Sequence, residues 1–355
     1  MKTILTLFTL AFISTANAQS TPSNKLGGSP IAPECEKGST IIQPLSEEKF
    51  IPVGGIEQWI TIKGDSCSNP VILFLHGGPG NPESIYADSV YAEWKSTFTI
   101  VHWDQRAAGK TYGRNPEPTN LNIEQMVQDG IGVAEYLISY LNKEKVILVG
   151  SSWGSILGVY LSHKNPNLFY AYVGTSQAGL DRESINSYNR TLAFAKDEED
   201  QESISAIEAL GVPPWTNPRN FGVIRRIQRG FEAQVTESPP SSWVASPSYA
   251  SPEYKESYIA GEDFSYIQYV GFNGDGFSKE IDLMSLGLNF QIPVYFVQGE
   301  EDLFTTSELS KEYFDSISAP DKDYLLLKNV GHGPNQLSHE ANFKILVDKV
   351  LPITK

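Results

Sequence analysis

The chain has 355 residues, with 42 acidic and 27 basic side chains and a formal net charge of −15 at pH 7. Hydrophobic residues make up 40% of it and aromatic residues 11%, which is enough for a sizeable core; the length favours one large domain with an insertion. The negative charge argues against nucleic acids and anionic membranes as partners.

The first residues have the pattern of a targeting segment. Met1-Lys2 is a positive start, the apolar stretch from Ile4 to Ile13 is too short to span a bilayer, and Ala16-Asn17-Ala18 is an A-x-A cleavage site. We therefore predict a signal peptide over 1–18 and a flexible leader rich in Ser, Pro and Gly over 19–38. The mature protein is expected to be secreted or periplasmic, with no membrane anchor.

Cysteine and histidine usage bears on disulfides and metals. Cys35 and Cys67 are the two cysteines of the sequence, and in an oxidising compartment they are a candidate disulfide; two free thiols are the alternative. The histidines are scattered, and neither a zinc-binding spacing nor a glycine-rich phosphate loop is present. We expect no metal and no cofactor.

The first elements of the chain are extended. Two alternating runs, 51–53 and 56–62, flank Gly54-Gly55 and predict an antiparallel hairpin. The continuous apolar run 71–75 predicts a strand buried on both faces, and it leads into His76-Gly77-Gly78-Pro79-Gly80. The glycines of this loop leave backbone N–H groups uncovered, as an oxyanion hole requires. For His76 we expect a structural hydrogen bond rather than a catalytic role.

Another buried strand is predicted over 98–103, followed by a loop in which Asp104 and Arg106 are expected to pair. An amphipathic helix over 121–141 follows, with its apolar residues at helical spacing.

The most informative stretch is Gly150-Ser151-Ser152-Trp153-Gly154. It lies between the apolar run 145–149 and a helical pattern that starts at Ser155. A serine at the centre of G-x-S-x-G, between strand and helix, is typical of a nucleophile elbow. The two outer glycines fit this interpretation, since side chains there would collide with the neighbouring strand and helix.

The alternation of strands and helices is interrupted after a strand over 168–173. We predict a mainly helical cap over 177–289, inserted into a core formed by 39–176 and 290–355, above the carboxyl edge of a parallel sheet. Its helical patterns cover 183–196, 203–210 and 221–235, while 238–252 is dense in Ser and Pro and 266–277 in Gly and aromatic residues. The alternation resumes with strands over 292–298 and 323–327 and helices over 306–317 and 335–350.

Ser152, Asp302 and His332 follow predicted strands in the order of an α/β-hydrolase triad. His332 would take the proton of the Ser152 hydroxyl, and Asp302 would orient His332 and stabilise its protonated ring. Glu300 and Glu301 compete for the acid role; we prefer Asp302 because it clears the strand end by one turn. The backbone N–H groups of Gly78 and Trp153 are the expected oxyanion donors.

At these motifs the chain resembles the prolyl iminopeptidase family of α/β-hydrolases. The resemblance rests on segments 76–80, 103–106, 150–155 and 299–302 and on Gly331-His332. It implies an α/β-hydrolase fold, with a mostly parallel, doubly wound sheet and an inserted helical cap. It also implies a serine hydrolase that releases a small or proline N-terminal residue from short peptides.

The sequence departs from that family in two places. The loop after Asp-Gln-Arg is Ala107-Ala108-Gly109-Lys110, where the family usually continues with Gly. In the family, cap glutamates hold the substrate's free amino group; here Glu208, Glu232 and Glu262 are candidates, with a solvated surface role as the alternative for each. Two other functions stay open: an esterase, amidase or lactonase acting on small acyl compounds with the same triad, and a non-catalytic binding protein.

Overall fold

The computed structural model describes residues 44–115 and 121–354. The chain divides into residues 1–30, none of which is described, and a unit over 31–355 to which every element below belongs. The predicted signal peptide, the leader and Cys35 lie outside the described residues, so export and the Cys35–Cys67 disulfide stay predictions.

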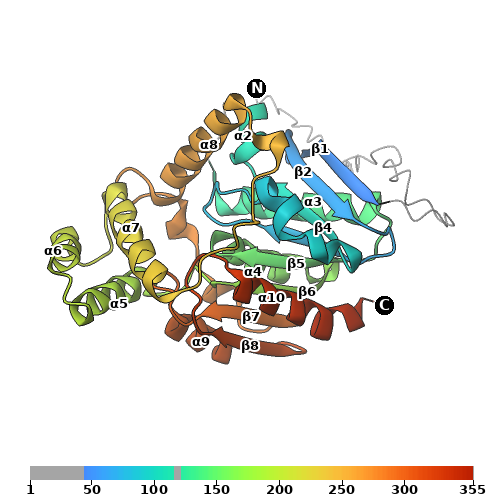
Figure 1. The fold of residues 1–355 in the computed structure, drawn as a ribbon. Coiled ribbons are helices and arrows are strands. Elements are labelled where there is room, and N and C mark those ends of the chain that lie inside the picture. Colours follow the sequence, from blue (N-terminus) through green and yellow to red (C-terminus); the bar gives the residue numbers. More distant parts are fainter. Residues whose placement is uncertain (1–43, 116–120, 355) are drawn as a thin grey trace, which may run out of the picture. The chain divides into compact units, whose positions relative to one another are not determined.

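An eight-stranded sheet with the order β1-β2-β4-β3-β5-β6-β7-β8 forms the centre of the described part (Figure 1). The pairs β1–β2 and β2–β4 are antiparallel, and the other neighbours are parallel. The predicted hairpin is confirmed, since Val53 pairs with Ile56 across the turn. The strands are β1 (Leu45–Val53), β2 (Ile56–Gly64), β3 (Val71–Leu75), β4 (Thr99–Asp104), β5 (Val146–Ser151), β6 (Phe169–Thr175), β7 (Val294–Gly299) and β8 (Lys322–Leu327).

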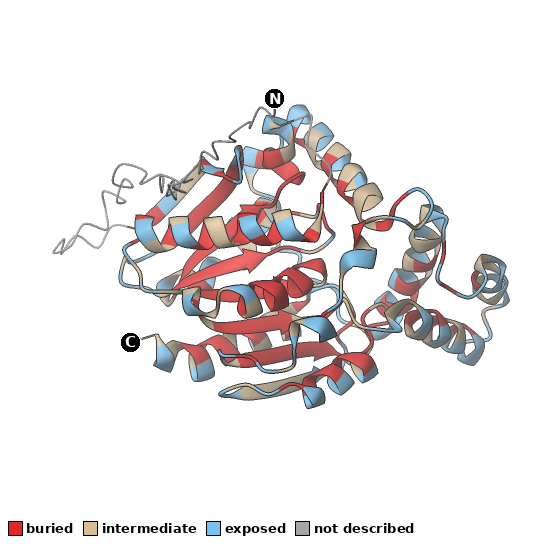
Figure 2. Cartoon of the chain, turned by 180° about the vertical axis from the view of Figure 1, so that it is seen from behind, coloured by how far each residue is buried: buried red, intermediate tan, exposed pale blue. Residues whose placement is uncertain are grey.

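Helices cover both faces of this sheet. In β3, Leu73 and Leu75 belong to the core layer that also holds residues of α3, α4 and α9, whereas Ile72 and Phe74 belong to the layer packed under α10. Such a strand is apolar at every position, which is why it stood out in the sequence. Figure 2 shows the inner strands almost wholly buried, whereas the edge strands β1 and β8 are partly exposed, as are the helices and loops. The α-helices outside the β6–β7 segment are α1 (Ala87–Val90), α2 (Gly109–Arg114), α3 (Ile123–Tyr140), α4 (Trp153–Lys164), α9 (Ser307–Ser316) and α10 (Gln336–Ile345).

Between β6 and β7 the described chain is helical and has no strand. The elements are α5 (Glu183–Asp197), α6 (Gln201–Leu210), α7 (Pro218–Val235) and α8 (Pro252–Val270). The first three match the helical patterns of the sequence. The fourth was not predicted, although Ser251 caps its N-terminus and Pro252 occupies its first position. The buried face of α8 includes Gly261 and Ser265, which lie against the Ala107 carbonyl. Because these residues are small or polar, the sequence of α8 lacks the apolar periodicity that marks a packed helix.

The closing helical segment reaches Val350 as expected, but its hydrogen-bond pattern changes along the way. We predicted one helix over 335–350, but α10 ends at Ile345, and residues Leu346–Val350 form a π-helical turn. The apolar residues Leu346 and Val350 are still fully buried in the layer beneath α10.

Candidate active site

Ser152 lies at the turn between β5 and α4. Its backbone has φ 53° and ψ −120°, a strained conformation for a residue with a side chain. A Cβ on Gly150 would lie 2.3 Å from the Gly154 carbonyl oxygen, and one on Gly154 would lie 1.8 Å from the Leu75 carbonyl oxygen. The glycines predicted on steric grounds are therefore required, because β3 and the start of α4 leave no room for a methyl group.

The structure brings Ser152, His332 and Asp302 together. His332 Nε2 lies 3.1 Å from Ser152 Oγ, and His332 Nδ1 lies 3.0 Å and 3.2 Å from the two carboxylate oxygens of Asp302. With its proton on Nδ1, His332 donates to Asp302 and accepts from the Ser152 hydroxyl. Asp302 follows β7 and His332 follows β8, so both reach Ser152 from the carboxyl edge of the sheet.

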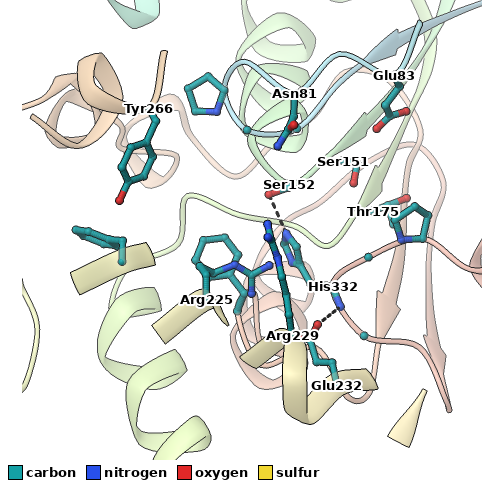
Figure 3. A pocket seen from close by; sticks show the side chains of 18 of the residues that line it. Asn81, Glu83, Ser151, Ser152, Thr175, Arg225, Arg229, Glu232, Tyr266 and His332 are labelled. Atoms are coloured by element: carbon teal, nitrogen blue, oxygen red, sulfur yellow. Dashed lines mark hydrogen bonds between the residues drawn. The ribbon is translucent and has the colours of Figure 1, made fainter. Parts of the chain in front are cut away.

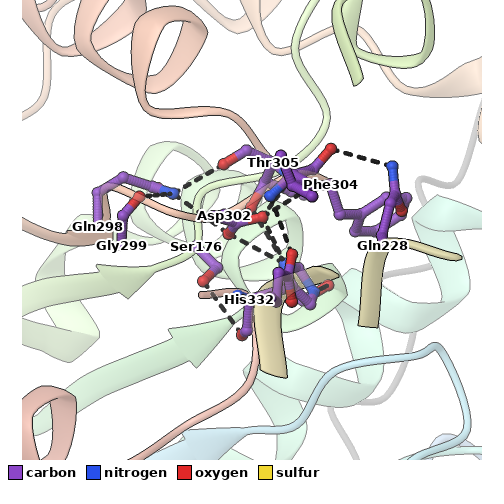
Figure 4. Close-up of polar contacts among 12 residues, drawn as sticks. Ser176, Gln228, Gln298, Gly299, Asp302, Phe304, Thr305 and His332 are labelled. Carbon is purple, nitrogen blue, oxygen red and sulfur yellow. Dashed lines mark hydrogen bonds and ion pairs between the residues drawn. The ribbon is translucent and has the colours of Figure 1, made fainter. Parts of the chain in front are cut away.

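Asp302 is fully buried and held by several donors (Figure 4). Its oxygens accept from the backbone N–H groups of Phe304 at 2.9 Å and Thr305 at 2.8 Å, from the Thr305 hydroxyl at 2.6 Å and from Gln298 Nε2 at 3.2 Å. Burial raises the pKa of Asp302, but the contact with His332, the hydrogen bond from Thr305 and the charge of Arg225 outweigh burial and lower it. The competing Glu301 instead accepts from the Val330 N–H at 3.2 Å.

Gln105 connects the Trp153 side chain with the start of the loop that carries Gly78. Gln105 Oε1 accepts from the Trp153 indole N–H at 2.8 Å, and Gln105 Nε2 donates to the His76 carbonyl at 3.2 Å. The His76 ring contacts the Gly77 carbonyl at 2.8 Å and accepts from the Gln105 N–H at 3.1 Å, and burial lowers its pKa to about 4. The hydrogen bonds predicted to hold this loop through His76 are therefore present. The Gly78 and Trp153 N–H groups have no hydrogen-bond partner within the described ranges.

A family model described as the alpha/beta hydrolase fold matches residues 70–335, which includes all of these positions. The chain belongs to the alpha/beta hydrolase family. It is a hydrolase, as the predicted fold and the resemblance to prolyl iminopeptidases indicated.

Known relatives of this alpha/beta hydrolase carry peptidase names. "Probable aminopeptidase YbaC" of Bacillus subtilis is 28% identical over 297 residues, covering 81% of this chain and 91% of that protein. A "Probable proline iminopeptidase" of Streptomyces coelicolor is 25% identical and covers 78% and 88%. The crystal structure of a proline iminopeptidase from Mycobacterium smegmatis shares the fold, with a TM-score of 0.60 and 17% identity over 86% of this chain and 98% of that one.

One expected contact near the hydrolase site is wrong. Arg106 does not pair with Asp104: its Nε donates to Asp129 Oδ2 at 2.7 Å and its Nη2 to Asp129 Oδ1 at 2.9 Å and to the Gly54 carbonyl at 2.7 Å. Asp129 lies on α3 and is fully buried, so its charge needs a cation, and the Arg106 guanidinium contacts both of its oxygens. Asp104 instead accepts from the Ser84 hydroxyl and the Lys110 N–H.

The three candidate glutamates of the cap have different environments. Glu208 is exposed on α6, 4.0 Å from Lys196, and does not line the pocket. Glu232 on α7 is only 6% exposed: its Oε1 accepts from the Leu303 N–H at 2.9 Å and its Oε2 from the His332 N–H at 3.3 Å. Glu262 on α8 is half-buried and lines the pocket.

The hydrolase has a pocket of about 1590 Å³ above Ser152 and His332 (Figure 3). Its walls come from the loop after β3, from α5, α7 and α8, and from the His332 loop. Arg225 and Arg229 of α7 project into it beside the Ser152–His332 pair. These arginines and Thr305 were not predicted from the sequence, although the cluster Arg225-Arg226…Arg229 in an acidic chain is a visible signal.

Metal-binding groups and membrane-spanning helices are both absent from residues 44–115 and 121–354. They contain no group of three His, Cys, Asp or Glu side chains arranged to hold a metal ion. None of their helices is long and apolar enough to cross a membrane.

Proposed function

We propose that this hydrolase is an exported serine aminopeptidase that removes the N-terminal residue of short peptides through an acyl-enzyme. The observation that carries the proposal is the chain of contacts from Ser152 Oγ through His332 to the buried Asp302 at the base of the pocket. A serine hydroxyl is a weak nucleophile until a neighbouring base takes its proton, and this geometry supplies that base with its orienting acid.

In the proposed reaction, Ser152 Oγ attacks the scissile carbonyl carbon while its proton passes to His332 Nε2. The Gly78 and Trp153 N–H groups stabilise the oxyanion. His332 then gives the proton to the leaving amine, and the C–N bond breaks to leave the acyl-enzyme. Water repeats the sequence: it loses a proton to His332, attacks the ester carbon and releases the amino acid, and His332 returns the proton to Ser152.

The aminopeptidase assignment rests on the relatives' names and on Glu262. Its helix passes so close to the oxyanion loop that a Cβ on Gly80 would lie 3.0 Å from the Cα of Glu262. Burial raises the pKa of Glu262, and the neighbouring Asn81 opposes that shift. Glu262 therefore lies beside Gly80, where the acyl part of the substrate would bind. Burial disfavours its negative charge, and the ammonium group of a substrate would stabilise that charge. Glu208 is too far out on the cap, and Glu232 is occupied by two backbone amides.

The deciding experiment measures hydrolysis of proline and alanine arylamides, each with a free and an N-acetylated amine. We expect turnover of the free-amine substrates only, its loss in Ser152→Ala, and a raised KM in Glu262→Gln. Equal rates on free and acetylated substrates would contradict an aminopeptidase. Cleavage confined to short-chain aryl esters would favour the esterase, amidase or lactonase alternative, and failure of a fluorophosphonate to label Ser152 would favour a binding protein.

Export is part of this proposal and rests on the first 18 residues. Expression of the full chain with its leader should release a mature protein beginning at Gln19, which mass spectrometry of the product can identify. A product retaining Met1 would contradict it.

A further inference from the structure

The arginines of the described ranges fall into two groups. Arg106, Arg114, Arg182 and Arg190 each pair with a carboxylate. The other four, Arg219, Arg225, Arg226 and Arg229, all lie on α7, and none of them makes an ion pair within these ranges. Arg219, Arg226 and Arg229 are exposed to solvent, whereas Arg225 is half-buried, so Arg225 is the arginine of this helix whose charge most needs a partner.

Arg225 is placed close to the reacting groups. Its guanidinium carbon lies 4.2 Å from the centre of the Phe304 ring, and that ring lies 4.9 Å from the His332 ring in an edge arrangement. Arg225 Nη1 donates to Gln228 Oε1 at 3.0 Å, and its other donors are unfilled among the described residues. Arg229, one turn further on, projects into the same pocket (Figure 3).

The carboxylates that act on Arg225 are already engaged. Glu232 and Asp302 both favour its charged form, but Glu232 accepts from two backbone amides, and Asp302 accepts from Thr305 and contacts His332. Burial works in the opposite direction and lowers the pKa of Arg225. An anion that binds to a half-buried guanidinium without a carboxylate contact stabilises its positive charge. The planar guanidinium can donate two parallel hydrogen bonds to one carboxylate.

We propose that Arg225 and Arg229 bind the C-terminal carboxylate of a di- or tripeptide substrate. This inference rests on the proposed aminopeptidase and names its substrate class. His332 protonates the leaving amine, so the part of the substrate beyond the scissile bond lies on the His332 side, where Phe304 and Arg225 follow. The two ring separations put Arg225 within about 9 Å of the His332 ring. An extended residue spans about 3.3–3.6 Å, so one or two residues beyond the bond reach the guanidinium.

The test compares alanyl-alanine and trialanine with their C-terminal amides, which differ only in the anionic group. We expect amidation to lower kcat/KM about ten- to hundredfold, the effect of one or two charge-assisted hydrogen bonds. Arg225→Gln should bring the acid-to-amide ratio close to one, Arg225→Lys should keep part of it, and Arg229→Gln should reduce it. Added salt should also reduce the ratio in the unaltered protein.

Arg219→Gln is the matched control, because Arg219 is an exposed, unpaired arginine of the same helix that does not line the pocket. It should leave the ratio unchanged. Fluorophosphonate labelling of Ser152 shows whether each variant keeps a folded site. Two results would overturn the carboxylate site and leave the aminopeptidase standing. One is equal cleavage of the acids and their amides. The other is an unchanged acid-to-amide ratio in an Arg225→Gln protein whose Ser152 is still labelled by the fluorophosphonate. Failure to cleave any of the four peptides overturns the carboxylate site, and it overturns the aminopeptidase as well if the free-amine proline and alanine arylamides are also left uncleaved.

Discussion

Glu232 connects the cap to both loops of the proposed triad, and its removal is the sharpest test of how the site is positioned. Its carboxylate accepts from the N–H of His332 and from the N–H of Leu303, the residue after Asp302. Burial and the charge of Asp302 raise the pKa of Glu232, whereas His332 and Arg225 oppose that shift. The side chain thus acts as an acceptor for two loop amides, which holds Asp302 and His332 at a fixed separation.

Glu232→Gln keeps the shape of the side chain but supplies one acceptor oxygen instead of two. If the amide oxygen keeps the shorter bond to Leu303, the NH₂ group faces the His332 N–H, and two donors oppose each other. Hydrogen bonds to charged groups contribute about 1.5–3 kcal/mol, so we expect the free energy of unfolding to fall by about 2 kcal/mol. A displacement of His332 by a fraction of an ångström should lower kcat/KM about ten- to hundredfold.

Urea melts and initial rates check both numbers, with Glu208→Gln as the control for the same chemical change at an exposed position. The decisive comparison is between a free-amine arylamide and an aryl ester that lacks an amine. A positioning residue lowers activity on both substrates, and it slows fluorophosphonate labelling of Ser152. Unchanged stability with a loss confined to the free-amine substrate would refute this reasoning and make Glu232 a substrate ligand.

Further predictions test the elbow, the acid and the pocket wall. Gly154→Ala should lower the free energy of unfolding by about 1–3 kcal/mol or more, because its Cβ would clash with β3. Gly230→Ala has open space at its Cβ in α7 and should raise the free energy of unfolding by about 0.5–1 kcal/mol. Equal effects of the two substitutions in urea melts would contradict the close packing at Gly154. Asp302→Asn should lower kcat about 10³–10⁴-fold with the fold intact, and a smaller loss in steady-state rates would point to another acid. Burial raises the pKa of Glu83 from 4.5 to about 7, and the hydrogen bond from Tyr91 opposes that shift. The folded state therefore binds a proton at Glu83 more tightly than the unfolded state does. The resulting contribution to folding stability is full below pH 4.5 and is lost as the pH rises through 7. Relative to the unaltered protein, Glu83→Gln should therefore gain about 1–3 kcal/mol of stability between pH 5 and pH 8, and a pH-independent difference would count against a neutral Glu83.

Much of the sheet and the proposed catalytic residues could be predicted because they obey local rules. A strand buried on both faces, such as β3, must be apolar throughout, and the sharp turn at Ser152 admits only glycine at positions 150 and 154. His332 was identified because parallel strands end at one edge, so side chains after β7 and β8 must meet there.

Features that depend on a partner distant in the sequence were decided by the tertiary structure. Asp104 and Asp129 are both fully buried, and only the fold shows that Arg106 contacts Asp129, while Asp104 accepts from the Ser84 hydroxyl and the Lys110 N–H. The helix α8 packs through Gly261 and Ser265 against the Ala107 carbonyl, a contact that leaves no apolar period to read.

The sequence by itself therefore determined the core sheet, the elbow and the order of Ser152, Asp302 and His332, since backbone sterics and strand burial act on neighbouring residues. It named Glu232 and Glu262 together and overlooked Arg225. Only the tertiary structure separated them, because the role of a charged side chain depends on which donors and acceptors the folded chain brings to it. Glu232 has two backbone amides, Glu262 lies beside Gly80, and Arg225 lines a pocket.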